Sequence, residues 1–200
     1  MSHYSQRRLQ QVAEAAASKK FDSTRHKCFI SYHAEDTDEV AQFLEDFGSE
    51  FIAKTIGVTD EDNFIDSQDT DYVMDQIRTK YLGDSSVTIV LIGGCTWARR
   101  YIDWEIFSSL RSSKHSSING LLAVTLPSIA ESSKILPPRL DDNVIRDSDD
   151  SEIGYARWKK YPTNAYSLRS WISDAYSART QRADLNVNSR ARKVNNSPCS

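Results

Sequence analysis

A glutamate on an amphipathic segment is the residue whose spacing best suits it to chemistry. The pattern predicts a helix over residues 97–111. Its apolar stripe consists of Ile102, Ile106 and Leu110. Glu105 lies three steps of about 100° from Ile102 and so sits roughly 60° from that stripe, where a carboxylate is partly desolvated, as many catalytic carboxylates are. The same position suits a boundary glutamate paired with Arg99 or Arg100, and spacing alone favours that structural interpretation.

Loop residues that follow the expected strands form a second set of candidates. Tyr32 and His33 follow the first strand, where they suit stacking on a ligand, hydrogen bonding to it, or ordinary loop packing. Asp66 and Asp69 follow a short second strand, and helix capping is their alternative role, favoured for Asp69. These positions matter because ligands of open parallel sheets bind outside the carboxyl ends of the strands.

Two further candidates belong to the segment that carries Glu105. Thr96 is expected to contact a ligand or, more simply, to cap the helix that begins near residue 97. Trp104 is expected to form the wall of a pocket or to join the core. Arg99 and Arg100 suit a diphosphate, and equally an ion pair between helices or subunits. No metal site is expected, since the three cysteines are widely spaced and form no CxxC pair.

Alternating apolar patterns predict the scaffold that positions these residues. Short apolar runs predict strands at 27–32, 63–66, 87–92 and 118–126. Helical spacing predicts helices with apolar positions from Val40 to Phe51, from a cap at Asp69 or Thr70 to Leu82, at 97–111 and at 166–178. Strands that alternate with helices indicate right-handed βαβ units. The expected fold is an α/β, flavodoxin-like three-layer sandwich with a central parallel sheet.

The loops exclude the commonest nucleotide sites of such folds. The sequence contains neither GxxxxGK[ST] nor GxGxxG, and the loop after the first strand holds no glycine. A phosphoacceptor receiver domain would need an aspartate where this chain has Gly93 and Gly94. Kinases, GTPases, classical dehydrogenases and receivers are therefore disfavoured.

Length and composition fit one globular domain with margins. The chain has 200 residues, of which 39% are apolar and 26% charged, and no apolar run approaches the roughly 18 residues of a membrane span. No secretory signal is present, and the odd, scattered cysteines do not suggest a disulfide framework. We expect a cytoplasmic protein without membrane contact.

Charge separates the two ends from the middle. Residues 1–28 carry six Lys or Arg against two acids and residues 179–200 carry five against one, which leaves a net charge of −11 between them. The expected organisation is a basic helical extension over 1–25, one domain over 26–180 and a disordered basic tail over 181–200. Single basic residues spread among polar ones suit a solvated tail, so nucleic-acid binding is disfavoured.

Three motifs carry a family resemblance. They are KCFISYH at 27–33, DSSVTIVLIG at 84–93 and TWARRYIDWEI at 96–106. In combination and at these intervals they resemble the TIR-like proteins of the Thoeris anti-phage system, the ThsB type, over residues 26–126. The resemblance implies the sandwich fold predicted above and a domain whose enzymatic members cleave NAD with one glutamate on the helix after the central strand. Glu105 occupies that position.

The same resemblance implies partners and a pathway. NAD would be a substrate rather than a bound cofactor, and the product a cyclic ADP-ribose-type signal that activates a separate effector. Activity would follow a phage-derived trigger and self-association into oligomers. The loop that holds Asp66 would border both the substrate and the subunit contact.

Two alternatives remain open at this point. One is a TIR-like scaffold that acts only by self-association, with Glu105 as a structural residue. The other is an enzyme similar to the nucleoside deoxyribosyltransferases, a related sandwich that also uses a glutamate on the sugar of its substrate. Tests with NAD and with deoxynucleosides would separate these alternatives from an NAD-consuming enzyme.

Overall fold

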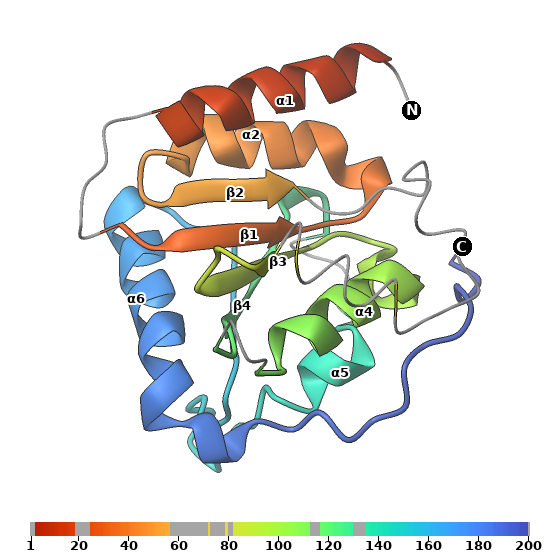
Figure 1. The fold of residues 1–200 in the computed structure, drawn as a ribbon, viewed down its shortest axis with the longest axis vertical. Coiled ribbons are helices and arrows are strands. Elements are labelled where there is room, and N and C mark those ends of the chain that lie inside the picture. Colours follow the sequence, from red (N-terminus) through yellow and green to blue (C-terminus); the bar gives the residue numbers. More distant parts are fainter. Residues whose placement is uncertain are drawn as a thin grey trace.

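Five strands form one parallel sheet in the order β2-β1-β3-β4-β5 (Figure 1). The computed structural model describes residues 3–18, 25–56, 72, 79, 82–112, 117–129 and 135–199. The strands are β1 (Lys27–Ser31), β2 (Ile52–Ile56), β3 (Val87–Ile92), β4 (Gly120–Thr125) and β5 (Arg157–Lys159). This order is that of flavodoxin-like sheets, which confirms the predicted fold class.

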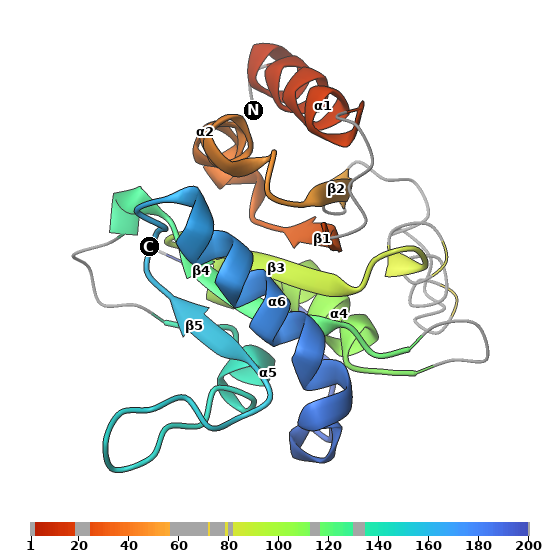
Figure 2. The same ribbon diagram turned by 90° about the vertical axis from the view of Figure 1, so that its left-hand side faces the viewer.

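Helices cover both faces of the sheet. The helices are α1 (His3–Ser18), α2 (Thr37–Phe47), α4 (Arg100–Ser109), α5 (Pro138–Asp141) and α6 (Ala165–Gln181). Figure 2 shows α6 in front of the strands and α4 behind them. The first face is covered by α2 and α6, the second by α4 and α5. Because all strands are parallel, their carboxyl ends lie at one edge, where α4 begins.

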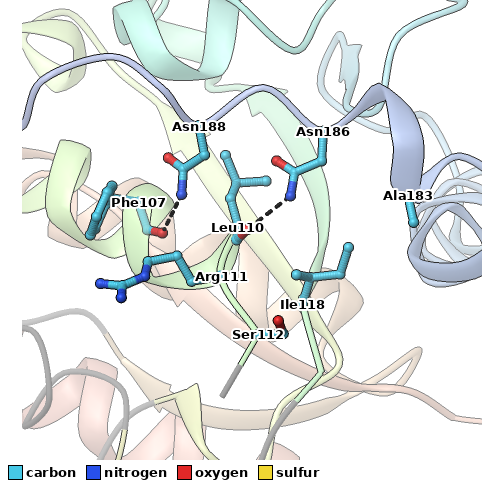
Figure 3. Close-up of a pocket in the computed structure, with 8 residues that line it drawn as sticks. All are labelled: Phe107, Leu110, Arg111, Ser112, Ile118, Ala183, Asn186 and Asn188. Carbon is cyan, nitrogen blue, oxygen red and sulfur yellow. Dashed lines mark hydrogen bonds between the residues drawn. The ribbon is translucent and has the colours of Figure 1, made fainter.

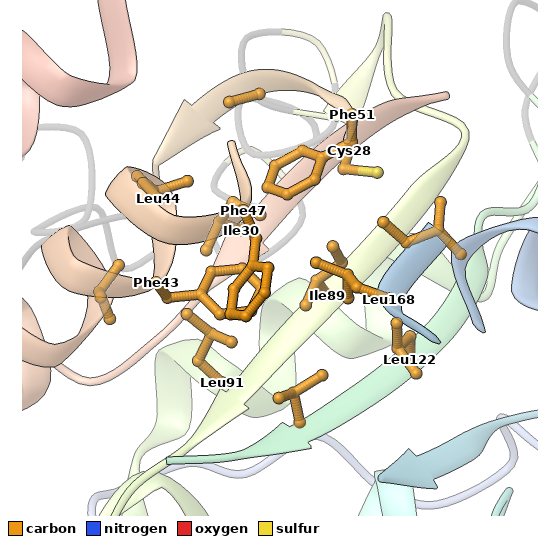
Figure 4. Close-up of a cluster of buried hydrophobic side chains, with 14 of the residues drawn as sticks. Cys28, Ile30, Phe43, Leu44, Phe47, Phe51, Ile89, Leu91, Leu122 and Leu168 are labelled. Atoms are coloured by element: carbon orange, nitrogen blue, oxygen red, sulfur yellow. The ribbon is translucent and has the colours of Figure 1, made fainter. Parts of the chain in front are cut away.

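The alternation of side chains along β3 divides the core between these faces. Ile89 and Leu91 join the cluster under α2 and α6, whereas Val90 and Ile92 join the cluster under α4 and α5. Figure 4 shows the first cluster, in which phenylalanines of α2 meet the strands. Every residue of β3 is buried, as the unbroken apolar run predicts for a central parallel strand.

The structure contains a strand next to β1 that the sequence pattern did not predict. The structure places β2 at Ile52–Ile56, beside β1. The prediction that the preceding helix extends to Phe51 is wrong, because α2 ends at Phe47, where the amide of Gly48 donates to the carbonyl of Leu44. Phe51 is buried in the core even so, which explains why its spacing resembled a continuing helix. The strand predicted at 63–66 and most of the helix predicted from Asp69 lie outside the described residues.

The helix that carries Glu105 begins later than its sequence pattern predicted. Thr96–Ala98 forms a separate 3-10 turn, and Arg99 is extended, with φ −93° and ψ 129°. The α-helix therefore runs only from Arg100 to Ser109. In contrast, α6 closely follows the predicted segment, and the Asn164 side chain caps it by accepting a hydrogen bond from the amide of Ser167.

The N-terminal helix docks on the domain rather than standing apart from it. Leu9 on α1 is 4% exposed and belongs to the first core cluster. Arg8 donates to Glu45 of α2 at 2.8 Å between Nη2 and Oε2. One of the two basic ends is thus paired with the acidic body of its own chain. Among the described segments there is no helix of the length and apolarity needed to cross a membrane.

The C-terminal segment is ordered, which corrects the prediction of a disordered tail over 181–200. Residues 182–199, called the strap below, leave α6 and run along α5 and α4 (Figure 1). Cys199 forms a disulfide with Cys95, which the cysteine count did not suggest. Polar side chains and backbone groups hold the strap through hydrogen bonds, and such contacts leave no hydrophobic period in the sequence.

Candidate active site

Glu105 and Ser31 meet where the end of β1 faces α4. Cys28 and Ile30 of β1 belong to the first core cluster, so the alternation of the strand directs Ser31 toward α4. The Ser31 hydroxyl donates a hydrogen bond of 2.5 Å to Oε2 of Glu105, which is only 1% exposed. The partly desolvated carboxylate that the sequence predicted is therefore a fully buried one, at the sheet edge where ligands of such folds bind.

Arg100, at the start of the helix that carries Glu105, has aromatic partners. The guanidinium of Arg100 lies 4.7 Å from the ring centroid of Tyr101 and 5.4 Å from that of Trp104. It also donates to the Tyr101 hydroxyl at 2.5 Å. Arg100 thus contacts the outward side of α4, whereas the Glu105 carboxylate is held from the sheet side by Ser31.

The charge of this carboxylate affects Tyr32, whereas His33 has a different acidic neighbour. Burial raises the pKa of the Tyr32 phenol, the negative charge of Glu105 raises it further, and a hydrogen bond with Thr37 partly opposes them. The Tyr32 side chain itself packs against the first core cluster. His33 Nε2 lies 3.5 Å from Oε2 of Glu35, a residue of the 3-10 turn that follows β1.

Thr96 closes the turn after β3 and does not cap α4. Its hydroxyl accepts a 2.8 Å hydrogen bond from the amide of Gly93 and lies 3.4 Å from the carbonyl of Leu91. The residue is completely buried. Because these partners are a backbone carbonyl of β3 and a backbone amide of the turn that follows it, the geometry gives Thr96 the task of shaping the loop between β3 and α4.

Asp36 is a site-edge carboxylate that the sequence analysis did not single out. Its carboxyl group lies so close to Gly93 that any Cβ at this position would collide with it. Burial raises the pKa of Asp36 to about 6, with further increases from Glu39 and Glu35, opposed by a hydrogen bond with Thr96 and by the charge of Arg99. One sequence feature could have identified Asp36. It is an acid in the loop after the first strand, combined with the glycine that follows the central strand.

Of the predicted site residues Trp104 and Asp66, the structure describes only Trp104. The indole Nε1 of Trp104 donates to the carbonyl of Lys193 at 2.9 Å, so the structure places this side chain under the strap. It therefore lies on a different side of α4 from the Ser31–Glu105 pair. Asp66 lies outside the described residues.

The sequence also did not predict a buried ion pair that involves α4. Arg139 Nε donates to Oδ1 of Asp103 at 2.9 Å, and the two side chains are 0% and 6% exposed. The pair joins α4 to α5. Within the part of the chain that the structure describes, no group of three or more His, Cys, Asp or Glu side chains has an arrangement that could hold a metal ion.

A separate groove lies at the opposite end of α4, beside the strap (Figure 3). Its volume is about 610 Å³. Asn188 and Asn186 cross it to donate to the carbonyls of Phe107 and Leu110 at 3.1 and 2.8 Å. Ile118, which precedes β4, also lines the groove. Since strands begin at this edge, the groove is distinct from the Ser31–Glu105 site.

A parallel sheet of this order with helices on both faces defines a flavodoxin-like α/β domain, and the helix after its central strand carries a buried glutamate. The family model of the Thoeris protein ThsB, TIR-like domain, matches residues 29–131, which is just over half of the chain, and the chain belongs to that family. Membership gives it a role in Thoeris defence. No curated protein matches the chain.

Proposed function

We propose that this protein is a TIR-type enzyme that cleaves the bond between nicotinamide and ribose in NAD and releases a cyclic ADP-ribose-type signal. That signal activates a separate effector after a phage-derived trigger reaches the protein in the cytoplasm. The observation that carries the proposal is the buried carboxylate of Glu105, which Ser31 holds at the carboxyl edge of the sheet. Family membership supports the same assignment.

The chemistry needs little more than one oriented carboxylate. Nicotinamide leaves NAD as a neutral molecule from a cationic centre, so its departure requires no general acid, and the ribose develops oxocarbenium character. Glu105 stabilises that positive charge and accepts hydrogen bonds from the ribose hydroxyls. Removing such electrostatic stabilisation typically lowers rates by about 100-fold or more.

Burial of the site favours cyclisation over hydrolysis. The Ser31–Glu105 hydrogen bond is buried, and Glu105 itself is only 1% exposed. If water stays excluded while the adenine of the same molecule is held near the anomeric carbon, the internal nucleophile gains an effective concentration of about 10⁵ M or more. The product is then a cyclic nucleotide that is lighter than ADP-ribose by one water.

Access to Glu105 requires an opening of the site. Because the residue is only 1% exposed, NAD does not reach the carboxylate in the conformation that the structure holds. We assign this opening to self-association, which completes the site from two chains. An isolated chain would then be inactive, and the oligomer active.

Nicotinamide release from NAD tests the proposal. Wild type, Glu105→Gln and Glu152→Gln are compared at high protein concentration, with products separated by chromatography and weighed. Glu152 is the matched control because its buried carboxylate binds Lys159 and Arg146 away from α4. We expect release by wild type and the control, and a loss of about 100-fold in Glu105→Gln.

The reaction products discriminate among the alternatives. A product lighter than ADP-ribose by one water supports cyclisation, whereas ADP-ribose alone contradicts it. Exchange of bases between deoxynucleosides, without NAD cleavage, would replace the proposal by a deoxyribosyltransferase-like activity. The complete burial of Glu105 and its bond to Ser31 also suit a structural role, and equal nicotinamide release by wild type and Glu105→Gln would favour the scaffold.

A further inference from the structure

The strap is attached to α4 in two different ways along its length. Residues 186–193, called the anchor, pair with buried groups of α4 and α5. Residues 194–199, called the latch, reach the first turn of α4 and end at the disulfide to Cys95. Figure 1 shows this last part passing α4 toward the C-terminal end.

Buried side chains hold the anchor. The guanidinium of Arg139 donates to three strap acceptors, namely Oδ1 of Asn188 and the carbonyls of Arg190 and Ala191. The amide of Lys193 donates to Oδ2 of Asp103 at 2.8 Å. Since Arg139 is wholly buried and also pairs with Asp103, these contacts hold the anchor independently of the disulfide.

The described contacts of the latch are fewer and nearer the surface. Asn196 accepts a 2.9 Å hydrogen bond from the amide of Arg100 through its side chain, and the amide of Ser197 donates to the carbonyl of Ala98 at 2.8 Å. Val194 at its start is 74% exposed. The disulfide, with 5.7 Å between the two Cα atoms, is the only covalent tie in the described part of the chain between the latch and the loop after β3.

We propose that Cys95–Cys199 is a reversible thiol–disulfide site, and that its reduction by a dithiol releases the latch from α4 while the anchor stays bound. Both cysteines are half-buried, so a reductant can approach, whereas Cys28 is completely buried. A thiolate of the reductant attacks one sulfur and forms a mixed disulfide, and its second thiol then displaces the protein sulfur. Two electrons and two protons pass to Cys95 and Cys199, and the reductant becomes a disulfide.

Release would affect two neighbouring elements. The amide of Arg100 at the start of α4 and the carbonyl of Ala98 would lose their latch partners. Cys95 lies between Gly93, which packs against Asp36, and Thr96, which closes the same turn. Reduction would therefore free the outward side of the first turn of α4 and loosen the loop at the carboxyl edge of the sheet.

Hydrogen exchange of the full chain, with and without dithiothreitol, tests the inference. We expect the amides of Arg100 and Ser197 to exchange about tenfold faster after reduction, and the amide of Lys193 to keep its rate because the anchor remains. Alkylation followed by mass measurement should find two new thiols on Cys95 and Cys199. Cys28 should stay unmodified, which shows that the core remains folded.

Variants distinguish release of the latch from a general loosening of the strap. Cys199→Ser without reductant should reproduce the faster exchange at Arg100, and Cys28→Ser should not. Failure of dithiothreitol to expose two thiols would overturn the inference, as would unchanged exchange at Arg100 after the thiols form. Equal acceleration at Lys193 would also overturn it, because the strap would then respond as one piece. None of these readouts depends on NAD cleavage.

Discussion

At the scale of single residues, the burial of Asp36 makes stability depend on pH. Its pKa of about 6 in the folded chain exceeds the ordinary value of 3.8, because burial and the nearby Glu39 and Glu35 favour the protonated form. The folded chain therefore retains this proton over a pH range in which the unfolded chain has lost it. The contribution of this group to stability falls as pH rises from about 4 to about 6.

Asp36→Asn removes this titration. We expect the variant to be more stable than wild type at neutral pH by about 1 kcal/mol, and the difference to disappear near pH 4, where Asp36 is protonated in wild type. Thermal unfolding at both pH values measures it. Asp38→Asn, at an exposed neighbouring position, is the control. The same difference from wild type at both pH values would contradict the role given to Asp36.

Ser31→Ala tests whether the hydroxyl positions Glu105. Loss of the buried hydrogen bond should lower the free energy of unfolding by about 1–2 kcal/mol. It should also lower kcat for NAD cleavage by about tenfold with little change in KM, because a displaced carboxylate loses transition-state stabilisation rather than substrate binding.

Ser109→Ala is the matched control for Ser31→Ala. Ser109 shares a buried 2.7 Å hydrogen bond with Thr88 between α4 and β3, so its removal also costs a contact between helix and sheet. The control should lose comparable stability and keep its kcat. Equal effects of both variants on kcat would show that Ser31 supports only the packing of α4.

At the scale of elements, the Asp103–Arg139 pair connects α4, α5 and the strap. Arg139→Leu leaves the Asp103 carboxylate buried without its cation and removes the donor for the anchor carbonyls. Breaking one side of a buried pair typically costs about 3–5 kcal/mol. Denaturant unfolding should show a loss of this size, against a much smaller one for Arg8→Leu, whose partner Glu45 is 36% exposed. Similar losses in both variants would contradict a special role for Arg139.

The elements also show which features were readable from the sequence. The unbroken β-branched run of β3 and the apolar stripe of α4 predicted a buried strand followed by the helix that carries Glu105. The strap was not predictable, because an Asn side chain that binds a helix carbonyl resembles any polar loop residue. The position of Asp36 at the site was not predictable for a related reason, since its approach to Gly93 depends on how two loops from separate strands pack.

At the scale of the whole molecule, the separation of charge has a local explanation. The basic ends pair with the acidic body of the same chain, through Arg8 with Glu45 and Arg190 with Asp142. The Arg190 guanidinium lowers the pKa of Asp142. Composition revealed the charge asymmetry, but only the fold shows that part of this positive charge is satisfied within the chain.

If NAD reaches the buried Glu105 only after self-association, the protein concentration should govern activity. We expect the specific rate of nicotinamide release to rise with protein concentration over about a hundredfold range, because oligomer formation follows mass action. Light scattering on the same samples should show oligomers appearing over the same range. A specific rate that stays constant while the protein remains monomeric would contradict the requirement for a second chain.

The most direct test of the central claim separates NAD binding from NAD cleavage in Glu105→Gln. Binding is measured by calorimetry under the conditions of assembly, and cleavage by single-turnover release of nicotinamide. A transition-state role predicts that Kd changes by no more than about threefold while the cleavage rate falls by about 100-fold or more. An unchanged cleavage rate, or a fall in cleavage matched by an equal loss of NAD binding, would contradict the assignment of Glu105 as the catalytic carboxylate.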